Sequence, residues 1–341
     1  MDDESPDVSR RRLLRASAAT ITVSAVGVGQ ASAGRERAIE SPFDDRCPAA
    51  TIRPSMAHCE GATTAACADD HPATIEFRAA VRETLEAQYP DVGALVDAGF
   101  KPYFDTLDVG DEEGWSHWLN PDHIGDRTNL DPGRPESVLV DNDSWRSMGV
   151  MFIATHDGDP VVPPAVYRAD DEGFRGPVTD ADQPLDLEHA GPEGDGHHGA
   201  GRDHGDHDHH DDRDGRDHED RQDHDAHQGD TDRCSPWHAH AGLPGRFAWW
   251  FYRQAYESDL ADGELRLPCR TPCMMHVWTV DHPGGVYAHG APPAASRDLE
   301  PADVSDLETD VVPGEDELSW ETLPDHVTPD ELPGDIPLLD L

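Results

Sequence analysis

Apolar positions with helical spacing mark the first ordered part of the chain. Over residues 73–89, Phe77, Val81 and Leu85 recur every four residues, which places them along one side of a helix. A proline follows, and residues 91–100 form a second, shorter apolar segment that stops at a glycine. The pattern therefore predicts two short helices whose apolar faces pack on another layer of the fold.

Further along, the pattern changes to short β-prone segments. Residues 145–154 are largely apolar, and a turn-forming loop separates them from the apolar segment 138–140. Residues 274–280 are equally β-prone, and an aromatic segment at 114–121 adds another short stretch. With the two helices, these segments predict an α+β fold with a mostly antiparallel β-sheet, in a single domain over residues 73–290.

Four other segments have distinct compositions. Residues 34–72 are rich in Pro, Ala and Thr and predict an irregular arm, whereas the clustered aromatics of 245–256 predict a helix packed on the sheet. Residues 180–232 hold ten histidines among mostly Asp, Gly and Arg, which predicts a disordered insertion. Such a tract binds zinc, nickel or copper weakly, or is an unselected acidic loop. Residues 291–341 predict a disordered acidic tail.

The charge balance is extreme. Among 341 residues, 71 are Asp or Glu and 26 are Lys or Arg, with Lys101 the one lysine, and the net charge is −45. A surface of this kind is typical of proteins adapted to molar salt, where the Debye length falls to about 3 Å and self-repulsion is tolerable. The charge argues against nucleic acid and anionic membrane surfaces as partners, because no basic patch is available to neutralise phosphates.

The N-terminus carries an export signal. Arg10, Arg11 and Arg12 match the twin-arginine pattern, and an uncharged, weakly apolar segment follows at 16–29. An A-x-A cleavage site comes next, so we expect a signal peptide over residues 1–33. The apolar segment is too short and too polar for a stable membrane span. The sequence thus predicts export by the twin-arginine machinery to the cell surface or the medium.

Six cysteines in an exported chain predict disulfides. They form two clusters of three, so at least one bridge would join the arm to the core if all six pair, and fifteen connectivities are possible. A thiolate metal site is the alternative, because Cys269 and Cys273 precede a histidine closely. The clusters are Cys47, Cys59 and Cys67, and Cys234, Cys269 and Cys273.

Histidines on two predicted strands suggest a metal site. His238 and His240 are two residues apart, so on a strand they point to the same face. His276 lies within the predicted strand 274–280, and His282 follows where that strand ends. Imidazole binds zinc, copper, iron and nickel. Among these divalent metals, zinc is our first candidate. The alternative is a set of core histidines held by hydrogen bonds.

Several motifs then follow one another in order: G-W-x-H-W-x-N, L-D-P-x-R-P-E-S, W-H-x-H and M-x-H-V-W-x-x-x-H-P-x-G. In this order they resemble a family of exported proteins of unknown function from haloarchaea and actinobacteria. The resemblance covers about residues 73–160 and 234–288, and the long insertion departs from the family pattern. It implies that His117 and Glu136 belong to one set with the four histidines above, so His117 is a further candidate ligand or neighbour.

Three functions fit these observations. The first is an exported metal-binding protein, with a folded histidine site and a histidine-rich loop. The second is a metal-dependent enzyme, hydrolytic or oxidative, that uses the same histidines with Glu136 or Asp281 as the carboxylate. The third is a disulfide-held surface interaction protein without metal. The usual motifs of serine hydrolases, zincins, P-loop proteins and dinucleotide-binding proteins do not occur in the sequence.

Two structural observations would separate these functions. A concave, open side on the ligand set favours an enzyme, whereas a closed tetrahedral set favours a structural or carrier role. Histidines that lie far apart, each hydrogen-bonded elsewhere, would favour the interaction protein.

Overall fold

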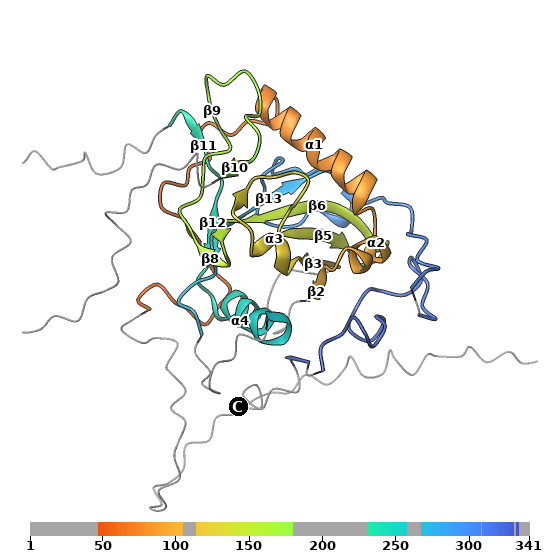
Figure 1. Cartoon of the computed structure of the whole chain (residues 1–341). Helices are drawn as coiled ribbons and strands as arrows, with labels where there is room; N and C mark the ends of the chain where they lie inside the picture. Colours follow the sequence, from red (N-terminus) through yellow and green to blue (C-terminus); the bar gives the residue numbers. More distant parts are fainter. Residues whose placement is uncertain are drawn as a thin grey trace, which may run out of the picture. The chain divides into compact units, whose positions relative to one another are not determined.

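The computed structural model describes residues 47–104, 114–179, 231–257, 267–307, 309–330 and 332–333. Within these residues the chain forms an antiparallel sheet with helices on both faces, so the α+β prediction is confirmed (Figure 1). The expected signal peptide and all but the last two residues of the expected insertion lie outside the described residues.

The main sheet has seven strands in the order β1-β12-β13-β6-β5-β3-β2, and every neighbouring pair is antiparallel. Strands distant in sequence thus become neighbours, because β12 and β13 come after the insertion yet complete a sheet begun before it. The strands are β1 (Met56–His58), β2 (Lys101–Tyr103), β3 (Trp115–Leu119), β5 (Ser137–Asp141), β6 (Arg146–Ile153), β12 (His238–His240) and β13 (Met274–Trp278).

Helices and short two-stranded ladders complete the described fold. The helices are α1 (Pro72–Gln88), α2 (Val92–Asp97), α3 (Pro121–Ile124), α4 (Leu243–Glu257) and the 3-10 turn η2 (Ala294–Ser296). The ladders pair β4 (Thr128–Asn129) with β10 (Val178–Thr179), β9 (Tyr167–Arg168) with β11 (Arg233–Cys234), and β7 (Thr155–His156) with β8 (Asp159–Pro160). Within the described residues, no helix combines the length and the apolar character that a membrane crossing requires.

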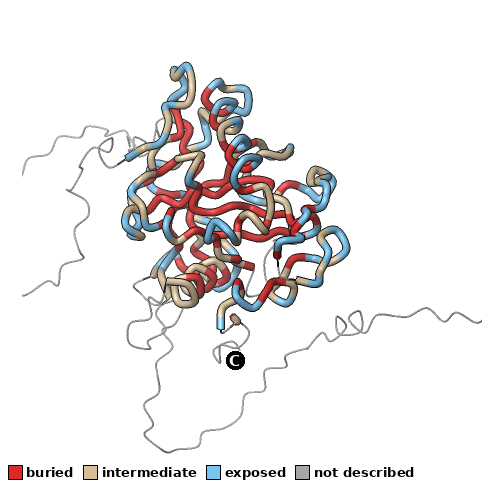
Figure 2. The backbone as a smooth tube through the Cα atoms, turned by 45° about the vertical axis from the view of Figure 1, so that its right-hand side comes forward, coloured by how far each residue is buried: buried red, intermediate tan, exposed pale blue. Residues whose placement is uncertain are grey.

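The strands of the main sheet are buried along most of their length (Figure 2). Because side chains alternate along a strand, the sheet has two buried faces. The face toward α1 packs Val138, Val150, Phe152, Ala239, Met275 and Val277 with Phe77, Val81 and Leu85 of the helix. The opposite face, toward α4, packs Trp115, Leu119, Leu139, Met151, Ile153, Met274 and Trp278 with Tyr252 of that helix. Two apolar layers therefore enclose the sheet, and its central strands β3, β5, β6 and β13 contribute to both.

The predicted N-terminal helices form as expected. The side chain of His71 accepts the N–H of Ala73 and caps α1, which buries its predicted apolar stripe. Phe77 from this stripe stacks on Phe152 of β6 with ring centroids 5.3 Å apart. The Asp91 side chain accepts the N–H of Ala94 and begins α2 in the same way.

The β5–β6 hairpin begins its return strand one residue later than predicted. Trp145 lies at φ 61°, a left-handed conformation that closes the turn, and its N–H donates to the carbonyl of Asp141 at 2.8 Å. Its ring is fully buried, and its indole nitrogen donates to the carbonyl of Asp316 at 3.0 Å. The hairpin turn is therefore packed against the C-terminal segment of the chain.

That C-terminal segment differs from the disordered tail we expected. Its backbone bonds to the hairpin turn: Leu318 donates to the carbonyl of Asn142 and Ala302 to that of Ser144, both at 2.8 Å. Its scattered apolar side chains join the core on the α1 face. They are Val304, Leu307, Leu318, Leu323 and Val327. The expectation was wrong for the described part of 291–341, because apolar residues without periodicity still bury surface when neighbouring loops satisfy their backbone.

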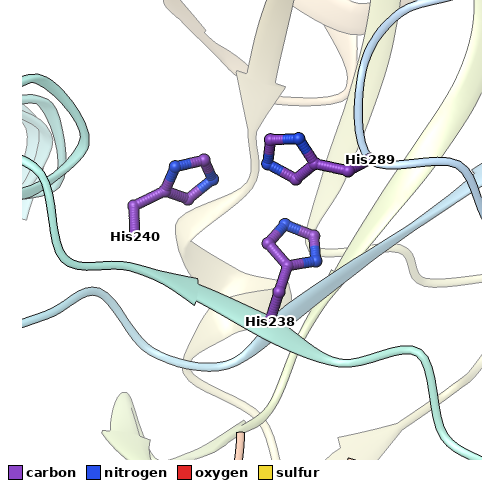
Figure 3. Close-up of side chains that lie close together, drawn as sticks. All are labelled: His238, His240 and His289. Atoms are coloured by element: carbon purple, nitrogen blue, oxygen red, sulfur yellow. The ribbon is translucent and has the colours of Figure 1, made fainter. Parts of the chain in front are cut away.

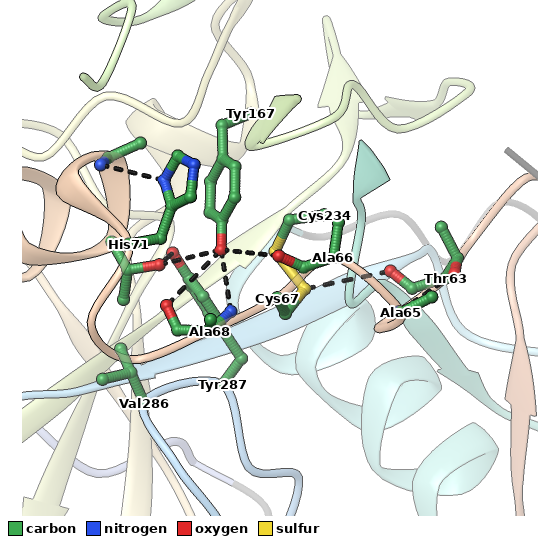
Figure 4. Close-up of a disulfide and its surroundings, with 12 residues drawn as sticks. Thr63, Ala65, Ala66, Cys67, Ala68, His71, Tyr167, Cys234, Val286 and Tyr287 are labelled. Atoms are coloured by element: carbon green, nitrogen blue, oxygen red, sulfur yellow. Dashed lines mark hydrogen bonds between the residues drawn. A yellow bond between two sulfur atoms is a disulfide. The ribbon is translucent and has the colours of Figure 1, made fainter. Parts of the chain in front are cut away.

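Three disulfides tie the N-terminal arm to the strands that follow the insertion. They are Cys47–Cys269, Cys59–Cys273 and Cys67–Cys234, so every bridge joins the two sequence clusters. In Figure 4 the last of these lies beside Tyr167, whose hydroxyl accepts the N–H of Ala68 at 2.9 Å. The predicted disulfides are confirmed, and the alternative of a thiolate metal site is excluded because all six sulfurs are bridged.

Candidate metal centre

Two of the candidate histidines lie on the edge-proximal strand β12. His238 and His240 flank Ala239, which points to the α1 face, so both imidazoles lie on the opposite face. Their strand is held on one side by β1 and on the other by β13. The Cys59–Cys273 bridge connects the residues that directly follow β1 and precede β13, which fixes these two neighbours around β12.

A third histidine comes from the loop after β13. His289 follows a turn in which Gly285 lies at φ 92°, a conformation that favours glycine. Trp278 then holds the loop back against the strand, since its indole nitrogen donates to the carbonyl of Ala288 at 2.8 Å. Its backbone N–H also donates to the carbonyl of Val286 at 3.0 Å. These bonds place His289 over β12.

The three imidazoles converge on one point (Figure 3). One ring nitrogen from each of His238, His240 and His289 lies within 4.8 Å of the other two. Ring centroids are 4.5 Å apart for His238 and His289, 5.2 Å for His240 and His289, and 5.4 Å for His238 and His240. An ion at the centre, with metal–nitrogen bonds of about 2.0–2.1 Å, can reach all three after small side-chain movements.

Two further histidines extend this group along the sheet. His276 on β13 has its ring centroid 5.5 Å from that of His238 and 5.9 Å from that of His289. His117 on β3 follows, 5.8 Å from His276. Five imidazoles thus form a continuous row. The first three meet at the candidate metal site, and His276 and His117 continue the row along the sheet.

The buried imidazoles of the row are held in the neutral form. Burial lowers the pKa of His117 to about 3 and that of His240 to about 4. Burial also lowers the pKa of His238 and of His276 well below the usual histidine range, and neighbouring imidazoles add to the effect. A neutral imidazole carries the lone pair that a metal ion requires.

Some imidazole nitrogens at the candidate metal site make no hydrogen bond in the described part of the chain and keep a lone pair available. Nε2 of His238 has no hydrogen-bond partner among the described residues, and neither nitrogen of His276 has one. His238 bonds to the backbone of Pro236, so this bond falls to Nδ1 and leaves the lone pair of Nε2 available to a ligand. An unpartnered buried imidazole nitrogen costs free energy, and a bound ion would remove that cost.

The ligand set opens onto a pocket of about 320 Å³ between the sheet and α4. His240, His289, His276 and His117 contribute to its wall, and no Asp or Glu is among the described residues that line it. The rest of the wall is largely apolar. It includes Met56, Trp115, Leu119, Met151, Trp249 and Met274.

Helix α4 approaches the site closely at Gly245. A Cβ at this position would lie 2.5 Å from Cβ and 2.9 Å from Cγ of His240, which is too close for any side chain. Glycine therefore allows the helix to pack directly against the imidazole and fix its position.

The structure brings together most of the histidines that the sequence singled out. His238 and His240 lie at the candidate metal site, and His276 and His117 continue the row of imidazoles along the sheet. His282 lies outside the row. Its Nδ1 accepts the N–H of Gly284 at 2.8 Å and its Nε2 lies 3.0 Å from the carbonyl oxygen of Gly290.

Neither candidate carboxylate reaches the pocket wall. Glu136 is buried directly before the start of β5, where its side chain accepts the N–H of Ile153 at 3.2 Å. Asp281 is fully exposed and pairs with Arg78 at 3.5 Å. The residue that sequence reasoning missed is His289. It stands in an irregular loop, and its one sequence signal is proximity to the strand that carries His276.

Comparisons of this chain with protein-family models, with curated proteins and with solved structures find no match.

Proposed function

We propose that this protein is exported and binds a divalent transition metal, zinc first, through His238, His240 and His289. The observation that carries the proposal is their convergence, with one nitrogen of each within 4.8 Å of the others. The unpartnered Nε2 of His238 supports it, because buried polar atoms are normally satisfied. A protein without metal was expected to have histidines that lie far apart and are each hydrogen-bonded elsewhere. These three histidines do not meet that condition.

The arrangement fits an open rather than a closed coordination sphere. Three imidazoles leave one position of a tetrahedral ion for water or another ligand, and two of the three, His240 and His289, line the pocket. The hydrogen bond from His238 to the backbone of Pro236 fixes its tautomer in the way that metal-binding histidines commonly show.

Export through the twin-arginine pathway is part of the same proposal. The twin-arginine motif and A-x-A site support it, and three disulfides fit an oxidising compartment. The resemblance to exported proteins of haloarchaea and actinobacteria is consistent with this location. We also propose that the histidine-rich segment 180–232 binds the same metals weakly.

A zinc titration against a competing chelator tests the folded site. His289 is exposed, so His289→Ala removes a ligand without opening a cavity in the core. We expect the variant to lose about 100-fold or more in zinc affinity, since even the outer partners of a metal ligand contribute about 10- to 100-fold.

The matched control is His71→Asn, which removes an imidazole on the other face of the sheet and keeps a good helix cap. Its zinc affinity should equal that of the unmodified chain. Equal affinity for His289→Ala and the control would contradict the proposal. A chain without residues 180–230 should keep the tight site and lose weak binding, which separates the two metal-binding elements.

A metal-dependent enzyme is the second candidate, and the pocket that His240 and His289 line favours it. The absence of acidic side chains among the described lining residues leaves general-base chemistry to a metal-bound hydroxide or to an imidazole. Hydrolysis of neutral ester substrates by the zinc-loaded chain, lost in His289→Ala, would establish this function. Activity that survives the substitution would exclude this site as its origin.

A further inference from the structure

Each histidine of the β12–β13 part of the site faces a methionine on the neighbouring strand. In the antiparallel register, His240 pairs with Met56, His238 with Met274, and His276 with Met151. Residues directly opposite in such a sheet point to the same face, with Cβ atoms about 4.5–5.5 Å apart. Three imidazoles and three thioethers therefore alternate across four strands.

All three of these methionines line the pocket. The chain has six methionines in total, so half of them gather at this one wall. Met275, in contrast, stands between Met274 and His276 and points into the core on the α1 face. Met56 is 44% exposed on edge strand β1, so filling the core does not explain its presence there.

Thioether sulfur is a soft ligand and selects monovalent copper, whereas zinc is satisfied by imidazole and oxygen. A neutral wall also suits a monovalent ion, because none of the described lining residues is acidic. Long, unbranched methionine side chains can turn toward an ion without moving the strands that carry them.

We propose that this pocket binds Cu(I), with the thioethers of Met56 and Met274 beside the imidazoles of His238 and His240. The assignment rests on the proposed metal site: it names Cu(I) as a further ion that the same imidazoles bind, and it adds two thioether ligands to them. Met151 and His276 lie deeper in the same wall and make a third pair of the same kind.

Competition for Cu(I) with bicinchoninate tests the assignment on the full, disulfide-intact chain. Ascorbate keeps copper monovalent without reducing the bridges, and a sulfate or acetate medium avoids chloride, which itself binds Cu(I). Met56→Leu and Met274→Leu conserve side-chain volume, so the packing of the sheet is retained. We expect each to weaken Cu(I) binding about 10- to 100-fold while the zinc affinity stays unchanged.

Met275→Leu is the matched control, because it makes the same change one residue away on the opposite face. Its Cu(I) and zinc affinities should both equal those of the unmodified chain. Unchanged Cu(I) binding in both pocket variants, or an equal loss in the control, would overturn the assignment. A chain that binds zinc but no Cu(I) would overturn the assignment alone. A chain that binds neither ion would overturn the proposed function as well.

Discussion

The loss of stability on removal of the Cys59–Cys273 bridge depends on the other disulfides of the chain. Its two cysteines are 214 residues apart, and a lone crosslink that closes so long a loop would stabilise the fold by about 5 kcal/mol through the entropy of the unfolded chain. The structure predicts a smaller value, because Cys47–Cys269 already closes nearly the same loop.

With the Cys47–Cys269 bridge in place, the additional loop that Cys59–Cys273 closes is short. Twelve residues separate Cys47 from Cys59 and four separate Cys269 from Cys273, so the extra loop contains about 16 residues. A loop of that length corresponds to about 3 kcal/mol. We therefore expect Cys59→Ala with Cys273→Ala to lower the free energy of unfolding by about 3 kcal/mol.

Denaturant unfolding followed by tryptophan fluorescence, in the salt that keeps the chain folded, measures this change. The unmodified chain and the double variant are compared with the other two bridges intact. A loss near the lone-crosslink value would show that the Cys47–Cys269 bridge does not restrict the unfolded chain as this topology requires. No loss at all would refute the entropic reasoning.

Two further substitutions probe the site and the core. Gly245→Ala places a methyl group against His240, so we expect weaker zinc binding in the chelator titration. The circular dichroism spectrum should stay unchanged. Full zinc affinity in this variant would show that α4 does not fix the imidazole of His240. Burial raises the pKa of Glu136 well above its usual range, so the folded chain keeps a proton there that the unfolded chain loses as pH rises through about 4.3. Stability due to this carboxyl is therefore present below that pH and falls above it, by roughly 1.4 kcal/mol for each pH unit until the folded-state pKa is reached. Glu136→Gln should be more stable than the parent at pH 7 and equal to it below pH 4 in denaturant titrations, and a variant that is less stable at pH 7 would contradict the burial argument.

The sequence predicted the elements whose residues repeat with a clear period. The stripe of Phe77, Val81 and Leu85 defined α1, and the alternation of Met274, His276 and Trp278 placed these three side chains on one face of β13. Local periodicity suffices for such elements because it determines which face is buried, whatever the partner.

Features that depend on contacts between distant parts of the chain could not be predicted from the sequence. Fifteen disulfide connectivities fit the cysteine spacing, and the pairing of β12 with both β1 and β13 brings Cys59 and Cys273 together. His289 stands in a loop without periodicity, and Trp278 and the turn at Gly285 bring it to the site. The packed C-terminal segment was missed for the same reason, since its order comes from bonds to the hairpin turn at 142–144.

X-ray absorption spectroscopy on the chain loaded with a single equivalent of zinc tests the central claim most directly. The account predicts three imidazole nitrogens at about 2.0–2.1 Å and one further light atom, with one imidazole fewer in His289→Ala. A shell without imidazole nitrogens, or an identical spectrum for His289→Ala, would contradict a metal centre built from His238, His240 and His289.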